Sequence, residues 1–180
     1  NKVASYDPLT GEPLWEFAGS TTECVTSTVT DGRVVFSTGG YPQNHVQAVV
    51  ADGSAQVAWE KKVRVYVPSL LLKNGHLYLV TDDGVAACWR VDDGEELWKS
   101  RLGGTFSSSP VLAGDRIYAT DESGRTTVFK ASPEKFESLA ENQLAQEVFA
   151  TPVIAGGRIY HRAATIDGDQ RQEWLYCLGE

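Results

Sequence analysis

The chain has 180 residues, with 24 acidic against 16 basic side chains and a formal net charge of −8 at pH 7. This acidic balance, without a cluster of Lys and Arg, argues against nucleic acid and anionic membrane surfaces as partners. The length suits one compact domain, and no stretch is apolar and long enough to predict a transmembrane segment.

The first residues predict two strands, over 3–6 and 13–17. A strand–turn–strand unit then begins, in which apolar runs at 26–29 and 34–36 flank Asp31-Gly32-Arg33. Similar turns follow at 74–76, 114–116 and 156–158, with spacings of 43, 40 and 42 residues between the third residues of successive turns. Each turn is predicted to be a two-residue type I′ hairpin, so the chain is a tandem repeat built from strands.

A third and a fourth strand complete each unit. The third strands are predicted over 46–50, 85–90, 126–130 and 174–178. The fourth strands carry an aromatic residue near their start, at Trp15, Trp59, Trp98 and Phe136. Four short strands in about 40 residues are typical of a β-propeller blade.

The predicted fold is therefore all-β, a propeller of four-stranded antiparallel blades with about four blades present. Residues 1–180 are expected to form a single domain: 1–21 give the third and fourth strands of a preceding blade, 22–61, 62–101 and 102–141 are full blades, and 142–180 are a last blade without its fourth strand. A closed four-bladed ring would leave 3–6 as a spare strand. We therefore favour part of a larger, seven- or eight-bladed ring.

The segment SYDPLTGEPLW carries a family resemblance. Ser5, Asp7, Thr10, Gly11, Glu12, Leu14 and Trp15 resemble the tryptophan-docking motif of the pyrroloquinoline quinone (PQQ) repeat family, with Ser5 in place of Ala. Gly94, Glu95, Leu97 and Trp98 keep the second half of the motif. The Asp is expected to accept turn N–H groups, the Gly to adopt a positive φ, and the indole to separate adjacent sheets. The structural docking residues are expected to be Asp7, Thr10, Gly11, Trp15, Trp59, Gly94 and Trp98.

No catalytic, cofactor-binding or metal-binding residues are expected in this chain. Cys24, Cys88 and Cys177 are predicted to be buried thiols that lie far apart. His45, His76 and His161 do not converge in any motif, and Asp167-Gly168-Asp169 lacks the spacing of an EF-hand. The acidic pairs Asp82-Asp83 and Asp92-Asp93 are interpreted as solvated turn formers.

The resemblance implies two possible functions. The first is a non-catalytic scaffold for protein–protein interaction, similar to the bacterial outer-membrane protein assembly factors, exported to the periplasm or the outer membrane and without a cofactor. The alternative is a fragment of a quinoprotein alcohol or sugar dehydrogenase that holds PQQ with calcium. That enzyme class has two adjacent cysteines, which this sequence lacks, so the scaffold is favoured.

Two connections between second and third strands are longer than the others, at 38–45 and 162–172, and are expected on the same face of the propeller. Long loops on a rigid scaffold commonly carry recognition residues. An extension without a binding role is the open alternative. The candidate partner-binding residues are Tyr41, Asn44, His45, His161, Arg162, Asp167, Asp169 and Arg171.

Overall fold

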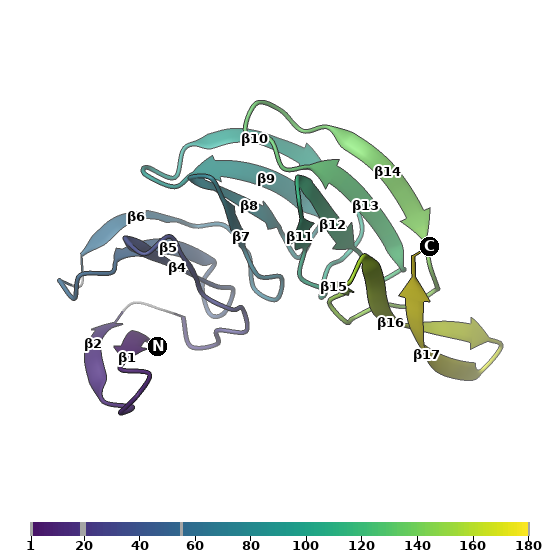
Figure 1. The fold of residues 1–180 in the computed structure, drawn as a ribbon, viewed down its shortest axis with the longest axis horizontal. Helices are drawn as coiled ribbons and strands as arrows, with labels where there is room; N and C mark the ends of the chain where they lie inside the picture. The colour runs from purple at the N-terminus through teal and green to yellow at the C-terminus, as the bar shows by residue number, and fades with distance from the viewer. Residues whose placement is uncertain (1, 19–20, 55, 180) are drawn as a thin grey trace.

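The computed structural model describes residues 2–18, 21–54 and 56–179, and these form strands, turns and loops without a helix. The five sheets follow one another along an open arc (Figure 1). The all-β propeller fold is confirmed, and the closed four-bladed ring is not formed.

The first sheet is a hairpin and the next three have four strands each, in chain order across the sheet. The hairpin is made of β1 (Lys2–Tyr6) and β2 (Pro13–Ala18). The first full sheet contains β3 (Val29–Thr30), β4 (Val34–Gly39), β5 (His45–Val50) and β6 (Val57–Lys61). The second contains β7 (Leu71–Lys73), β8 (His76–Val80), β9 (Val85–Arg90) and β10 (Glu96–Arg101).

The third full sheet contains β11 (Val111–Ala113), β12 (Arg116–Thr120), β13 (Arg125–Lys130) and β14 (Ser138–Gln143). The last sheet has three strands, β15 (Val153–Ala155), β16 (Arg158–Asp167) and β17 (Gln170–Leu178). Phe136 was expected at the start of a fourth strand but precedes β14 by two residues, where its ring packs on Trp98 and Phe129.

The hairpin turns between the first two strands of each sheet differ from the single type that was predicted. Asn74-Gly75 and Gly156-Gly157 have positive φ at both residues, as type I′ requires. In the Gly114-Asp115 turn only Gly114 has a positive φ, which is the type II′ pattern. The first turn is longer, because Thr30 pairs with Val35 and four residues lie between them. The prediction of type I′ is therefore wrong at the Gly114-Asp115 turn and at the first turn, between Thr30 and Val35.

The hydrophobic core consists of clusters between consecutive sheets. Phe36, Trp59 and Trp89 belong to the cluster between the first and second full sheets. Tyr78, Trp98, Ile117 and Phe129 belong to the next. The cluster against the last sheet is small, with Ala145, Val148 and Ala163 buried and Tyr176 packed on them. Burial therefore comes from stacking one blade on the next, as in other repeat proteins.

Candidate interaction surface

The turn between β1 and β2 is held by its own side chains. The Asp7 carboxylate accepts hydrogen bonds from the backbone N–H groups of Leu9 (2.7 Å) and Thr10 (3.0 Å). These bonds hold the pKa of Asp7 below its ordinary value. Gly11 has a φ of +76° in the same turn. The turn is thus stabilised by short-range bonds that the Asp, Thr and Gly types permit.

Each indole of the docking motif lies against the next sheet. The Trp59 Nε1–H donates to the Val91 carbonyl (2.7 Å), and a Cβ at Gly94 would come within 2.8 Å of the Trp59 ring. The Trp98 Nε1–H donates in the same way to the Ser132 carbonyl (2.8 Å). Trp15 lies over Gly53, at 3.6 Å from the Cβ position. Trp59 and Trp98 are buried and join consecutive blades, whereas Trp15 is half-buried.

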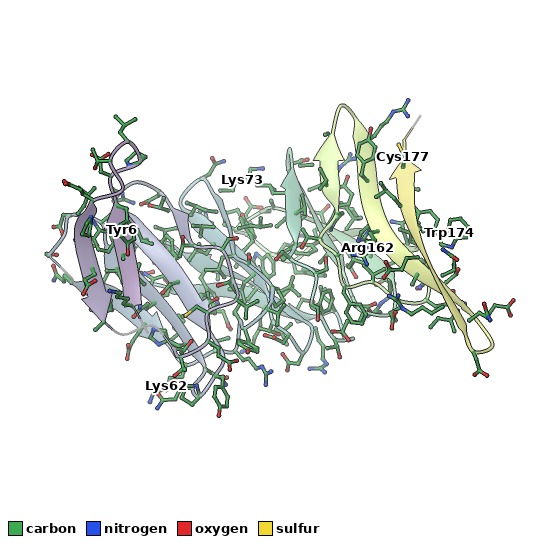
Figure 2. All side chains as sticks on the ribbon, turned by 90° about the horizontal axis from the view of Figure 1, so that it is seen from below. Tyr6, Lys62, Lys73, Arg162, Trp174 and Cys177 are labelled. Carbon is green, nitrogen blue, oxygen red and sulfur yellow. The ribbon has the colours of Figure 1, made fainter. Side chains whose placement is uncertain are left out.

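The turns between the second and third strands lie along one edge of the arc, which we call the loop edge. It comprises loops 40–44, 81–84 and 121–124 and the tip of the β16–β17 hairpin at 168–169. Figure 2 shows Lys62, which follows β6, and the hairpin tip at this lower edge, whereas Lys73 and Cys177 lie toward the opposite edge. The connections between sheets also form backbone hydrogen bonds with these turns. The Phe106 N–H donates to the Asp82 carbonyl, and the Val148 N–H donates to the Glu122 carbonyl.

Two acidic side chains in these turns are more buried than the sequence suggested. The Asp82 carboxylate accepts from the N–H groups of Tyr66 (2.8 Å) and Val67 (3.2 Å), which belong to the preceding connection. The interpretation of Asp82 as a solvated turn former is therefore wrong. Asp121, 2% exposed, forms an ion pair with Arg125, whose guanidinium also donates to the Leu102 carbonyl (2.9 Å). Sequence reasoning missed Asp121. The available signal was its ion-pair partner Arg125, which stands where the preceding unit has Val85.

The loop at 40–44 connects β4 to β5 after the Gly39–His45 pair. Tyr41 and Asn44 are exposed, and Tyr41 pairs through an isolated bridge with Glu23. The Glu23 carboxylate in turn accepts a hydrogen bond from the Tyr66 hydroxyl. The loop is therefore attached to the first two full sheets and presents Tyr41 to solvent.

The segment 162–172 was expected to be a loop, but it is the outer part of a β-hairpin. β16 and β17 pair continuously from Ile159–Leu178 to Asp167–Gln170, and Gly168 has a φ of +56° at the tip. Arg162, Asp167, Asp169 and Arg171 are exposed on this hairpin. A paired hairpin holds these side chains more rigidly than a loop would.

Charged side chains on one face of this hairpin form a network. Glu173 accepts from the Arg162 Nε–H (2.8 Å) and from the Arg171 Nη1–H (2.8 Å), and Arg171 also forms an ion pair with Glu147. The bonds from Arg162, followed by those from Arg171, hold the pKa of Glu173 below its ordinary value. A hollow of about 70 Å³ lies among these residues, with Phe149 and Ala150 in its wall.

His161 does not belong to this exposed set. It is 3% exposed on the opposite face of β16, and its Nε2 atom lies 3.0 Å from the Ala150 carbonyl oxygen. The structure therefore separates His161 from the exposed candidate residues, and its role in partner binding stays a prediction. His45 is half-buried at the start of β5, with its Nε2 atom buried.

Protonation of His161 should reduce the stability of the fold. Burial lowers the pKa of His161 below its ordinary value, so the unfolded chain binds this proton more readily than the folded chain. We expect the free energy of unfolding to fall as the pH drops from about 7 to 5, around the ordinary His pKa of about 6.5. Urea unfolding across this range should show a smaller fall for His161→Gln. An equal fall in both proteins would contradict this assignment.

The cysteines occupy different environments. Cys88 is buried, and burial raises its pKa to about 11. Cys24 and Cys177 are exposed, so the prediction that all three are buried is wrong. Within residues 2–18, 21–54 and 56–179, no group of three or more His, Cys, Asp and Glu side chains could hold a metal ion. That same part of the chain contains no helix suited to crossing a membrane.

Comparison with known proteins assigns the family. The family model described as outer membrane protein assembly factor BamB matches residues 1–164. The chain belongs to the BamB-like PQQ-repeat family. The structure of BamB from Moraxella catarrhalis is similar to it, with a TM-score of 0.67 and 13% sequence identity over 90% of this chain and 50% of that chain. The present chain thus spans about half the length of that BamB.

Other solved structures share the fold of this BamB-like chain. The computationally designed Ika8 protein matches with a TM-score of 0.71 and 14% identity, over 95% of this chain and 51% of that chain. The designed Ika4 protein matches with a TM-score of 0.67 and 16% identity, over 92% of this chain and 99% of that chain. A europium-containing methanol dehydrogenase matches with a TM-score of 0.55 and 20% identity, over 71% of this chain and 27% of that chain. No curated protein matches the sequence significantly.

Proposed function

We propose that this chain is a non-catalytic scaffold that binds a protein partner in outer-membrane protein assembly through its loop edge. Its membership of the BamB-like family supports this class of function and a periplasmic or outer-membrane-associated location. The observation that carries the choice of surface is the extended β16–β17 hairpin. In the two preceding sheets, the corresponding turns occupy only 81–84 and 121–124.

The side chains on and beside the hairpin are of types suited to binding a protein partner. Arg162 and Arg171 are held by Glu173 before any partner arrives, so less side-chain freedom is lost on binding. Phe149, which is exposed beside them, offers an aromatic contact. Arginine and aromatic side chains are the types that most often dominate the binding energy of interfaces. Tyr41 adds a second exposed aromatic residue at the same edge.

The scaffold is tested by capture of outer-membrane assembly proteins on the immobilised chain. Shortening both loop 40–44 and the hairpin tip at 165–172 should abolish capture and leave the urea midpoint of the sheets nearly unchanged. A matched control is Arg116→Glu, an exposed Arg at the start of β12, beside the hairpin turn at the opposite edge. Retained capture by the shortened chain would reject the loop edge as the binding surface.

The quinoprotein dehydrogenase remains the alternative from the sequence resemblance. The likeness to methanol dehydrogenase concerns the fold alone. Among the described residues, no three His, Cys, Asp or Glu side chains lie together in a way that could hold a metal ion. Dye reduction that depends on added PQQ and calcium would favour this alternative.

A further inference from the structure

An open cavity of about 360 Å³ lies between the third full sheet and the last sheet, which are neighbours in the arc (Figure 1). Its volume is within the range of about 300–1,000 Å³ that is usual for ligand-binding sites. Among the described residues that line it, none is Asp, Glu, Lys or Arg. The walls include Tyr118, Thr120 and Thr126 of the third full sheet and Ile159, His161 and Leu178 of the last sheet.

Aromatic rings fill the equivalent space between the second and third full sheets. There the rings of Trp98 and Phe129 lie 6.3 Å apart, between centroids. The strand registers place Ala140 of β14 at the position of Trp98 and Leu178 of β17 at the position of Phe129. Two rings of the preceding interface are therefore replaced by smaller side chains beside the cavity.

Two threonines in the cavity wall replace apolar residues of the preceding interface. Thr120 pairs with Thr126, where Val80 pairs with Ala86 in the second full sheet. The two Oγ1 atoms lie 2.8 Å apart, so one hydroxyl hydrogen is used in the bond between them. The other hydroxyl keeps a hydrogen that it can donate elsewhere. Thr126 is half-buried and Thr120 is buried, so Thr126 is the better placed to donate to a ligand.

The opposite wall carries an imidazole. His161 takes the position that Ala119 has in the third full sheet, and it is 3% exposed. Its Nε2 atom lies 3.0 Å from the Ala150 carbonyl oxygen, so Nε2 carries a hydrogen and donates it. Burial lowers the pKa of His161, which keeps the ring neutral at pH 7. The Nδ1 atom is then without a hydrogen and can accept one from a ligand.

We propose that this cavity binds a small neutral ligand that has an aromatic body and a hydroxyl group. The aromatic body takes up space that Trp98 and Phe129 fill in the preceding interface. A hydroxyl suits both polar walls, because it can donate to His161 and accept from Thr126. A charged ligand is disfavoured, since it would lose hydration without an Asp, Glu, Lys or Arg among the described lining residues to pair with it.

Binding of 2-naphthol, followed by its fluorescence, is the first test. An apolar cavity of about 150 Å³ holds a benzene ring, so the present cavity has room for two fused rings. We expect saturable binding of 2-naphthol and several-fold weaker binding of naphthalene, which lacks the hydroxyl. The anion 2-naphthoate should bind more weakly than 2-naphthol. No saturable binding of 2-naphthol, or equal affinity for 2-naphthol and naphthalene, would overturn the proposal.

A combined variant locates the bound 2-naphthol. Thr120→Val, Thr126→Ala and His161→Ala together copy the apolar residues of the preceding interface. This variant should lose the preference for 2-naphthol over naphthalene. Thr127→Val is the matched control, because Thr127 is buried at the next position of β13 and faces the other side of the sheet. The control should keep the native preference, and an unchanged preference in the combined variant would overturn the proposed site.

If circular dichroism shows that the combined variant does not fold, Ala140→Trp replaces it. Ala140 lines an adjoining hollow that shares Tyr118 and Asn142 with the cavity. A tryptophan there restores the ring that Trp98 supplies in the preceding interface, and it should fill part of the cavity. We expect weaker binding of both 2-naphthol and naphthalene. Native affinity for both compounds in Ala140→Trp would overturn the proposed site.

Discussion

Replacing Trp98 by alanine should lower the free energy of unfolding by about 3–5 kcal/mol, the usual range for removing a buried tryptophan. Trp98 is 8% exposed, and its ring lies 6.3 Å from the Tyr78 and Phe129 rings and 5.7 Å from the Phe136 ring, between centroids. The substitution also leaves the Ser132 carbonyl without its indole donor. These contacts join the second and third full sheets, so the substitution weakens the packing in the middle of the repeat.

Urea unfolding followed by circular dichroism measures this loss. Trp174→Ala is the control, because Trp174 is 51% exposed and its indole N–H donates to the Thr165 hydroxyl at the surface. The control should lower the free energy of unfolding by much less than Trp98→Ala. Equal midpoints for Trp98→Ala and the native chain would show that this indole does not join the blades.

Replacing Asp121 by alanine should lower the free energy of unfolding by about 3 kcal/mol, the lower end of the range for breaking a buried ion pair from one side. The Asp121 carboxylate accepts from the backbone N–H groups of Ser123 (3.0 Å) and Arg125 (3.1 Å), and from the Arg125 Nε–H (3.1 Å). Alanine leaves these donors without the acceptor that the buried Asp121 side chain supplies. Because Arg125 is one-third exposed, water compensates part of the loss.

The preceding unit supplies a matched rescue. There Thr81 occupies the equivalent position, and its hydroxyl accepts from the Val85 N–H (2.9 Å). Asp121→Thr combined with Arg125→Val copies that turn and should recover much of the stability lost in Asp121→Ala. Asp115→Ala, in an exposed turn of the same sheet, should have little effect. Urea unfolding of the four proteins tests this pair, and equal stability of Asp121→Ala and the native chain would contradict it.

Most of the fold was predictable from the sequence because each repeat carries the same short-range pattern of residues. Alternating apolar residues and turn residues recur every 40 to 43 positions, so the strands around Asn74-Gly75 and Gly156-Gly157 follow from short-range rules. The turn at Gly114-Asp115 took another type because either type closes a two-residue hairpin. Gly at the first central position is the type II′ signature, so the Gly114-Asp115 sequence carried a signal that the prediction of a single turn type overlooked.

The candidate surface was predicted less well. Aligning the last unit to a 40-residue blade made 162–172 a loop, although the Gly168 turn signal and the alternation along β16 and β17 were present in the sequence. The buried positions of His161 and Asp121 depend on neighbouring sheets, through Ala150 and the connection at Leu102. Contacts of this kind have no periodic pattern in the sequence.

Binding of a protein partner through the β16–β17 hairpin can be tested by one affinity measurement. The partner captured from outer-membrane extract is titrated against the native chain, Arg162→Glu combined with Arg171→Glu, and the Arg116→Glu control. We expect the double variant to bind at least about tenfold more weakly, since truncating or reversing interface arginines commonly changes binding by more than 1.4 kcal/mol. The control should bind as the native chain does. Unchanged affinity in the double variant would contradict the claim.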